Sequence, residues 1–270
     1  IRVFGFHPRD ICGLNHFRLP FVDTQNTTCH MKKMQIEVWS DIMCPFCYIG
    51  KRNMEKALSK FEYAHNVEIE WKSFQLNPNL PMGNGTKQNA YEYLAKHKGI
   101  SYQESVQMHK NVSKVASEAG LTYNFDKTLI ANSFNAHRVL QLAKSKGIGD
   151  KAEELLFHSY FTEGKDISDT QTLYDLGGVL GFSKDDIDQA LNLEIFEQGV
   201  KSDIAEARKL AVNGVPFFAF NRKYAISGAQ QPEIFLEVLE KSFAEWRADN
   251  PIPAMQTFDG QVCTSDGGCN

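Results

Sequence analysis

The 270-residue sequence has no long apolar run and no block of like charge. Its longest uncharged apolar-rich stretch, residues 210–221, is shorter than the roughly 20 residues that a membrane-spanning helix needs. Charged residues make up 23% of the chain and balance to a formal net charge of −4, which argues against a basic surface for nucleic acid. We therefore expect neither membrane nor nucleic acid among its partners.

The sequence also lacks a nucleotide-binding fingerprint and a secretory signal. GNGTKQ, at residues 83–88, has neither the spacing nor the strand-to-helix context of a phosphate-binding loop. Residues 1–30 show no continuous apolar core and no small-residue cleavage site. We expect residues 1–33 to be an extension outside the fold, without a function for Cys12 or Cys29, and we expect a cytoplasmic protein, in which thiols stay reduced.

Hydrophobic periodicity divides the rest of the chain into three parts. Strand-like alternation at residues 35–40 and 66–76 returns at 215–220 and 224–227, while helical spacing broken by glycines dominates between them. Neither outer part has enough strands for a sheet of its own, so the two must share one. We expect a mixed α/β domain made of residues 34–86 and 212–250, a helical insertion over residues 87–211 and a cysteine-containing tail over residues 251–270. One predicted helix covers residues 127–146.

Cys44 and Cys47 form a C-x-x-C pair where the first predicted strand gives way to a helix. Pro45 suits the first helical position, which places Cys44 at the helix N-terminus. Unpaired backbone N–H groups and the positive end of the helix dipole stabilise a thiolate there, and the thiolate is the nucleophile. Cys47, one helical turn further, can then resolve the mixed disulfide that Cys44 forms with a substrate.

Two other interpretations of the pair remain open. Cys44 and Cys47 could supply half of a structural zinc site, completed by Cys263 and Cys269 in the tail, although the spacing of the tail cysteines suits a zinc site poorly. The pair could also be a purely structural disulfide, which a reducing compartment disfavours. We favour a redox pair and expect no bound metal.

Pro216, in NGVPFF, stands at the start of a predicted strand, where proline is tolerated only at special places. A cis Val215–Pro216 bond would bring the backbone of Val215 beside the two sulfurs, where its N–H and C=O could hold an extended substrate as an added strand. An ordinary trans proline that opens a strand is the alternative.

Four segments together resemble the DsbA-type thioredoxin-fold family, and its FrnE-like branch in particular: SDIMCPFCYIGKRNMEKAL, ANSFNAHRVL, NGVPFFAFNRKYAISGAQQPEIF and the cysteine-containing tail. The resemblance covers about residues 34–270. It implies a thioredoxin fold interrupted by a large all-helical insertion domain, a cis Pro216 facing the active site, and dithiol–disulfide oxidoreductase or isomerase activity. It also implies that Cys263 and Cys269 form a second redox pair. We expect this pair to exchange disulfides with Cys44 and Cys47 or with a partner, and an unstructured tail is the alternative.

The sequence departs from the family pattern at two positions. Exported DsbA enzymes have histidine between the cysteines where this chain has Phe46, so we predict a weaker oxidant. Thioredoxins commonly have a buried acid six residues before the first cysteine, and here that residue is Val38. Glu37 and Asp41 are the remaining candidates for a proton acceptor, although solvation or capping explains both more simply.

Three further side chains are candidates for substrate binding. Met43 and Phe46 could supply an apolar surface around the thiolate, whereas the neighbouring Trp39 suits core packing. His137 lies on a predicted helix of the insertion, where it either packs internally or faces the groove at Cys44.

These observations together predict a thiol–disulfide oxidoreductase or isomerase with no resident cofactor and with glutathione as an optional thiol co-substrate. We expect proteins or small molecules that contain disulfides or dithiols as substrates, and a monomer or homodimer. The first alternative is a glutathione-dependent isomerase or transferase, similar to the kappa-type transferases and hydroxychromene carboxylate isomerases, although such relatives typically lack the full C-x-x-C. The second alternative is a chaperone-like binding module.

Overall fold

The structure, a computed structural model, describes residues 32–83 and 88–251. Four of the six cysteines lie outside these residues: Cys12, Cys29, Cys263 and Cys269. The N-terminal extension without function and the second redox pair therefore stay predictions. Among the described residues, no helix is both long and apolar enough to cross a membrane.

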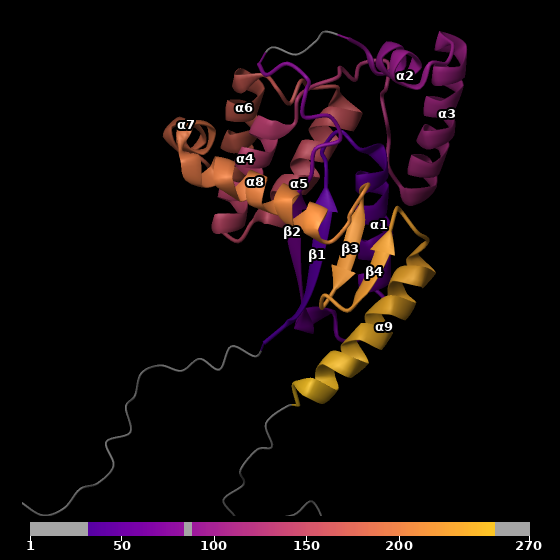
Figure 1. Cartoon of the computed structure of the whole chain (residues 1–270), viewed down its shortest axis with the longest axis vertical. Coiled ribbons are helices and arrows are strands. Elements are labelled where there is room, and N and C mark those ends of the chain that lie inside the picture. Colours follow the sequence, from indigo (N-terminus) through magenta and orange to yellow (C-terminus); the bar gives the residue numbers. More distant parts are fainter. Residues whose placement is uncertain (1–31, 84–87, 252–270) are drawn as a thin grey trace, which may run out of the picture. The chain divides into compact units, whose positions relative to one another are not determined.

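One sheet joins the two ends of the described chain (Figure 1). Its strands run in the order β2-β1-β3-β4, with β1 (Met34–Ser40) parallel to β2 (Val67–Ser73). On its other side β1 pairs antiparallel with β3 (Phe217–Phe220), which in turn pairs with β4 (Tyr224–Ser227). The expectation that the outer parts of the chain share one sheet is confirmed.

Side chains that alternate along β1 bury both faces of this sheet. Val38 belongs to the larger core, together with Phe218 of β3, whereas its neighbour Trp39 packs with Ala207 and Ala219 on the opposite face. Trp39 donates its indole N–H to the Asp203 carbonyl at 3.0 Å and is fully buried, which confirms its packing role. A central strand with two apolar faces is typical of α/β folds whose sheet is covered on both sides.

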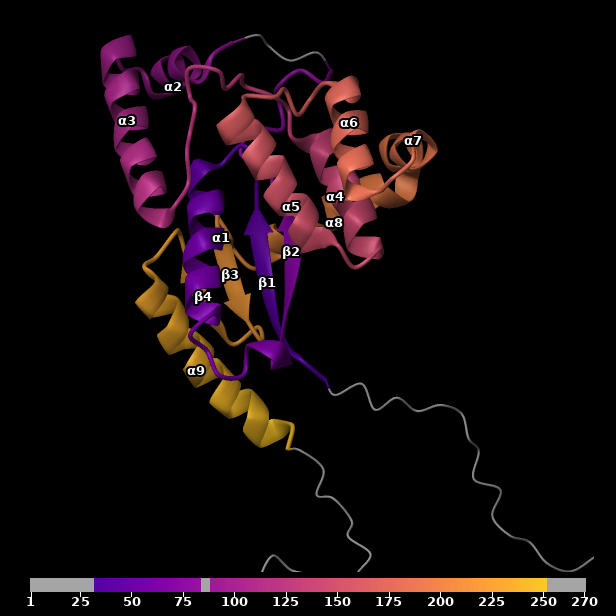
Figure 2. The same cartoon turned by 180° about the vertical axis from the view of Figure 1, so that it is seen from behind.

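Helices from different parts of the chain cover the two faces. Helix α1 (Pro45–Leu58) and helix α5 (Gly149–Phe157) lie on one face (Figure 2), and α8 (Glu194–Lys209) crosses the opposite face (Figure 1). The last helix, α9 (Pro232–Asp249), packs along α1 and contacts β3 and β4. The sheet is therefore covered by helices of both the thioredoxin part and the insertion.

The insertion is helical, as the glycine-punctuated periodicity predicts. Besides α5 and α8, it contains α2 (Ala90–Lys98), α3 (Tyr102–Ala119), α4 (Phe134–Ser145), a π-helical segment (His158–Glu163), α6 (Thr170–Leu180) and α7 (Lys184–Asn192). A short 3-10 turn (Ala64–Asn66) precedes β2, outside the insertion. Ser101 and Glu104 form a capping box at the start of α3, and Gly120 ends it in a left-handed conformation. Local polar and glycine signals thus fix the boundaries of this helix.

The prediction of a helix over residues 127–146 is wrong in its first part. Helix α4 begins only at Phe134, because the segment before it pairs its backbone outside a helix. Leu129 forms an isolated antiparallel bridge with Asn89, and the Ile130 N–H donates to the Gln88 carbonyl at 2.9 Å. Tertiary pairing of the backbone here outweighs the helical spacing of the apolar residues.

Candidate active site

The cysteine pair lies where β1 ends and α1 begins, as the sequence predicts. Cys44 is the N-cap residue of α1, with extended backbone angles, and Pro45 opens the helix. The Cys44 N–H donates to the Asp41 carbonyl at 2.9 Å, which closes the turn between strand and helix. The Cys44 sulfur therefore stands at the positive end of the helix dipole, where negative charge on it is stabilised.

The two sulfurs differ in their access to solvent. Cys44 is 5% exposed, whereas Cys47 is wholly buried, and both are free thiols. Burial and the neighbouring Cys44 raise the pKa of the Cys47 thiol well above its ordinary value. The Ser40 hydroxyl and the Asp41 backbone act in the opposite direction and lower the pKa of this thiol. This contrast suits a slightly exposed nucleophile with a fully shielded thiol behind it.

The Val215–Pro216 bond is cis, as the family resemblance implies. The Cys44 thiol donates toward the Val215 carbonyl, with 3.4 Å between sulfur and oxygen. Gly50 of α1 permits this close approach, because a methyl group at Gly50 would stand 3.1 Å from the ring of Pro216. The structure thus brings together Cys44, Cys47, Val215 and Pro216 from two ends of the chain.

Asp41 and Glu37, which the sequence analysis expects to be solvated or capping, are both buried. The Asp41 carboxylate accepts the backbone N–H groups of Met43 at 3.2 Å and Leu76 at 2.7 Å, so it caps two loops inside the protein. Glu37 accepts two hydrogen bonds from Arg222, at 2.6 and 2.5 Å. Each carboxylate is buried because it has partners that offset the loss of water.

His137 lies inside the protein and not on the wall of a groove. It is fully buried, and its Nε2–H donates to the Phe74 carbonyl at 2.9 Å, 3.6 Å from the Asp41 carboxylate. The structure therefore favours the packing interpretation, in which His137 holds the loop after β2 near the cysteine turn.

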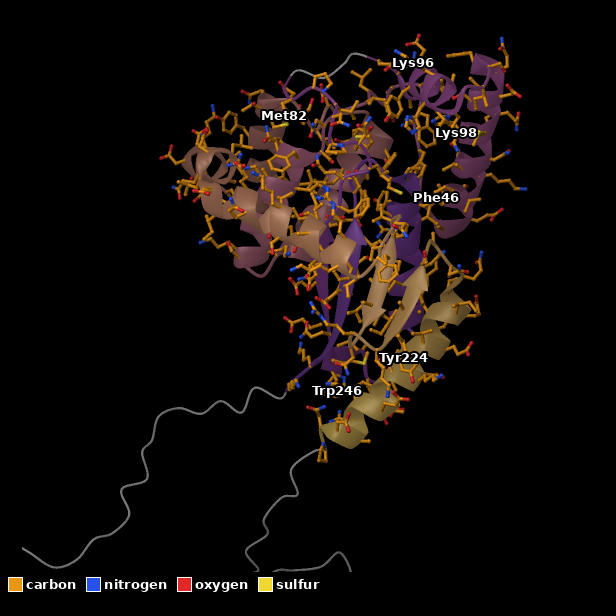
Figure 3. The ribbon with its side chains drawn as sticks, in the orientation of Figure 1. Phe46, Met82, Lys96, Lys98, Tyr224 and Trp246 are labelled. Carbon is orange, nitrogen blue, oxygen red and sulfur yellow. The ribbon has the colours of Figure 1, made fainter. Side chains whose placement is uncertain are left out.

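A cavity of about 420 Å³ opens beside Cys44, between the thioredoxin part and the first two insertion helices. Met43 and Phe46 line it next to the sulfur, as the sequence analysis expects of an apolar surface. Helix α2 contributes Leu94 and, at its C-terminal end, Lys98, which Figure 3 labels on the same side of the molecule as Phe46. Phe46 is 43% exposed and forms part of the rim. The insertion thus supplies one wall of a cavity that adjoins the nucleophile.

Comparison with known proteins decides the family. The model of the DsbA-like thioredoxin domain matches residues 35–240. The chain belongs to the DsbA-like thioredoxin family. A probable DsbA oxidoreductase from Streptomyces coelicolor has a similar structure, with a TM-score of 0.74 and 29% identity, over 88% of this chain and 98% of that one.

Two further proteins are similar to this DsbA-like chain at lower identity. The uncharacterized protein YwbO from Bacillus subtilis is 25% identical over 75% of this chain and 94% of its own length. The cytosolic disulfide reductase DsbM from Pseudomonas aeruginosa has a TM-score of 0.55 and 16% identity, over 78% of this chain and 99% of that one. At such low identity the DsbM match shows a common fold.

The DsbA-like site contains one acidic residue that the sequence analysis missed. Glu153 of α5 is fully buried, and the Ser40 hydroxyl donates to its Oε1 at 2.7 Å. Burial raises its pKa from the ordinary 4.5 to about 7. The available signal was its spacing, because Glu153 stands one turn before Phe157 on a helix face that also buries Leu156.

No metal site adjoins the DsbA-like pair within the part of the chain that the structure describes. Over residues 32–83 and 88–251, no group of three or more histidine, cysteine, aspartate or glutamate side chains is placed to hold an ion.

Proposed function

We propose that this protein is a thiol–disulfide oxidoreductase or isomerase in which Cys44 attacks and Cys47 resolves. The observation that supports this most directly is the position of the Cys44 sulfur, at the start of α1 and 3.4 Å from the Val215 carbonyl. Cys47 lies one turn further along the helix, without access to solvent. Family membership supports the same chemistry, and the proposed substrates are disulfide- or dithiol-containing proteins or small molecules.

The proposed reaction has two steps. The Cys44 thiolate attacks a substrate disulfide, a bond forms between Cys44 and one substrate sulfur, and the other substrate sulfur leaves as a thiolate. Cys47 then loses its proton and attacks the Cys44 sulfur, which releases the second substrate thiolate and leaves an enzyme disulfide. The reverse sequence oxidises a dithiol. Glutathione is a suitable small thiol for returning the enzyme to its starting state.

The surroundings of the sulfur suit an extended substrate with an apolar side chain. The Val215 backbone would pair with the segment that contains the reacting cysteine, in the manner of an added strand. The neighbouring side chain would enter the cavity between Phe46 and Leu94, whose walls are mostly apolar. His97 and Lys98 at the end of α2 also line this cavity and could meet a negative charge on the substrate.

Replacing Cys47 with serine tests the order of the two steps. The Cys47→Ser variant still permits attack by Cys44 but cannot resolve the product, so we expect a covalent enzyme–substrate disulfide to accumulate. Non-reducing electrophoresis and mass spectrometry after mixing with an oxidised peptide would detect one peptide per enzyme, released by reductant. The matched control is Cys44→Ser, which should trap none. Trapping by Cys44→Ser with none by Cys47→Ser would contradict the assigned roles.

Replacing Phe46 with histidine tests why this pair should be a mild oxidant. An imidazolium between the cysteines would stabilise the reduced form through the Cys44 thiolate, so we expect the reduction potential of Phe46→His to rise by about 30 mV, equivalent to about 1.4 kcal/mol. Equilibration with glutathione buffers of defined ratio measures the potential. The control Phe46→Leu, which adds no charge, should leave it near that of the unmodified protein. An unchanged potential in Phe46→His would contradict the explanation.

A further inference from the structure

Burial of Cys47 hinders the loss of its proton, which resolution of the mixed disulfide requires. Cys47 must lose a proton before its sulfur can attack, yet its side chain is wholly buried and its pKa is raised well above the ordinary value. Solvent cannot take the proton directly from a fully covered thiol. The protein therefore needs an internal acceptor within hydrogen-bonding reach.

Ser40 and Glu153 form a chain of polar groups that starts at this thiol. Ser40, the last residue of β1, is buried, and its hydroxyl is among the groups that lower the pKa of the Cys47 thiol. The same hydroxyl donates to Glu153 Oε1 at 2.7 Å, which is the direction that would pass a proton from sulfur to carboxylate. Among the described residues, the second oxygen, Oε2, is buried without a hydrogen-bond partner. A carboxyl group so incompletely satisfied inside a protein calls for a functional explanation.

The other nearby carboxylates already have different partners. Asp41 accepts two backbone N–H groups, and Glu37 is held by Arg222 in a two-point ion pair. Position 38, where related folds commonly have an acid, is the apolar Val38, packed in the core. Glu153 comes instead from the helical insertion.

We propose that Glu153 is the proton acceptor for Cys47, with the Ser40 hydroxyl as the relay. This inference rests on the proposed function and assigns the proton of its second step. As Cys47 attacks the Cys44 sulfur, the thiol proton passes to Ser40 Oγ while the Ser40 proton passes to Glu153. The substrate sulfur leaves as a thiolate, so charge is conserved. In the oxidising direction the protonated Glu153 returns a proton by the same path to the departing Cys47 thiolate.

Burial and the groups around Glu153 set the pKa at which it exchanges protons. Burial raises its pKa to about 7, while the hydrogen bond from Ser40, His137 on α4 and Lys51 on α1 lower it and Asp150 on its own helix raises it. Asp41, in the turn after β1, lies 3.6 Å from His137. A group whose pKa lies near neutrality both accepts and returns protons under ordinary conditions, which is the requirement for a general acid–base.

A two-phase assay separates this step from the first attack. Reduced protein mixed with dithiobis(nitrobenzoate) releases one coloured thiolate when Cys44 attacks and a second when Cys47 resolves. In the unmodified protein we expect the rate of the second phase to rise with pH through an inflection near 7. In Glu153→Gln, which keeps an acceptor for the Ser40 hydroxyl, we expect that phase to slow by at least about tenfold above neutrality, because the general base is lost. The inflection should disappear, while the first phase keeps its rate.

Two further variants show whether the path runs through Ser40. Ser40→Ala should slow the second phase similarly, and the double variant should be no slower than either single one. Glu154→Gln is the matched control, since Glu154 lies next in sequence but pairs with Arg52 at the surface of α1; it should change neither phase. An unmodified protein without the inflection, or a Glu153→Gln second phase of unchanged rate and pH profile, would overturn the inference. Absence of the first phase would instead overturn the proposed function.

Discussion

Replacing Cys44 with serine should lower the rate of disulfide exchange by at least about a thousandfold, because the nucleophile is removed from a step that nothing else can perform. A serine hydroxyl does not ionise near neutrality, and it cannot form the disulfide bond through which electrons pass. The fold should survive, since the substitution exchanges one small side chain for another at a helix N-cap, where serine is favoured. Reduction of insulin disulfides in the presence of a thiol reductant would measure the loss.

The same variant distinguishes the three functions that the sequence leaves open. A chaperone-like binding module would suppress aggregation of an unfolded protein equally well with Cys44→Ser. A glutathione-dependent isomerase or transferase would depend on Cys44 far more than on Cys47, whereas an oxidoreductase needs both. Catalytic turnover that falls by less than about tenfold in Cys44→Ser would contradict thiol–disulfide exchange at this pair.

Local sequence patterns predict the scaffold of the site well. Alternating apolar residues give β1, proline fixes the first turn of α1, and these two elements alone place Cys44 at the helix N-terminus. The position of Pro216 beside the sulfur needed more, because nothing local connects residues about 170 apart. The resemblance of four ordered motifs to one family supplied that connection.

Side chains that act across elements escaped prediction for a physical reason. The sequence left open whether Asp41 is solvated or capping and whether His137 packs internally or faces the groove, because their burial depends on the Leu76 and Phe74 loop that folds over them. Glu153 belongs to a helix of the insertion, and its contact with Ser40 spans 113 positions. Periodicity shows which residues share a helix face, but not which strand that face covers.

Glu153→Gln should also stabilise the folded protein at alkaline pH. A carboxyl with a folded pKa of about 7 and an ordinary value of 4.5 ionises more readily when unfolded, so ionisation favours the unfolded chain. The penalty is absent below the ordinary pKa, where both states are protonated, and grows as the pH rises toward the folded pKa. At about pH 8 we expect the free energy of unfolding of Glu153→Gln to exceed that of the unmodified protein by about 3 kcal/mol, since each pKa unit corresponds to about 1.4 kcal/mol.

Urea denaturation at several pH values measures this difference. The gap between Glu153→Gln and the unmodified protein should close at about pH 4, where glutamate is neutral in both states. Glu154→Gln should behave oppositely and lose stability at neutral pH, because Arg52 and the Tyr48 hydroxyl lower the pKa of Glu154 in the folded state. Its deficit should shrink as acid protonates the carboxyl. A pH-independent gap for Glu153→Gln would mean that Glu153 is not titrating inside the fold. A gap that opens with pH would show that the protein keeps a destabilising acid in contact with the Ser40 hydroxyl, which a purely structural role does not explain.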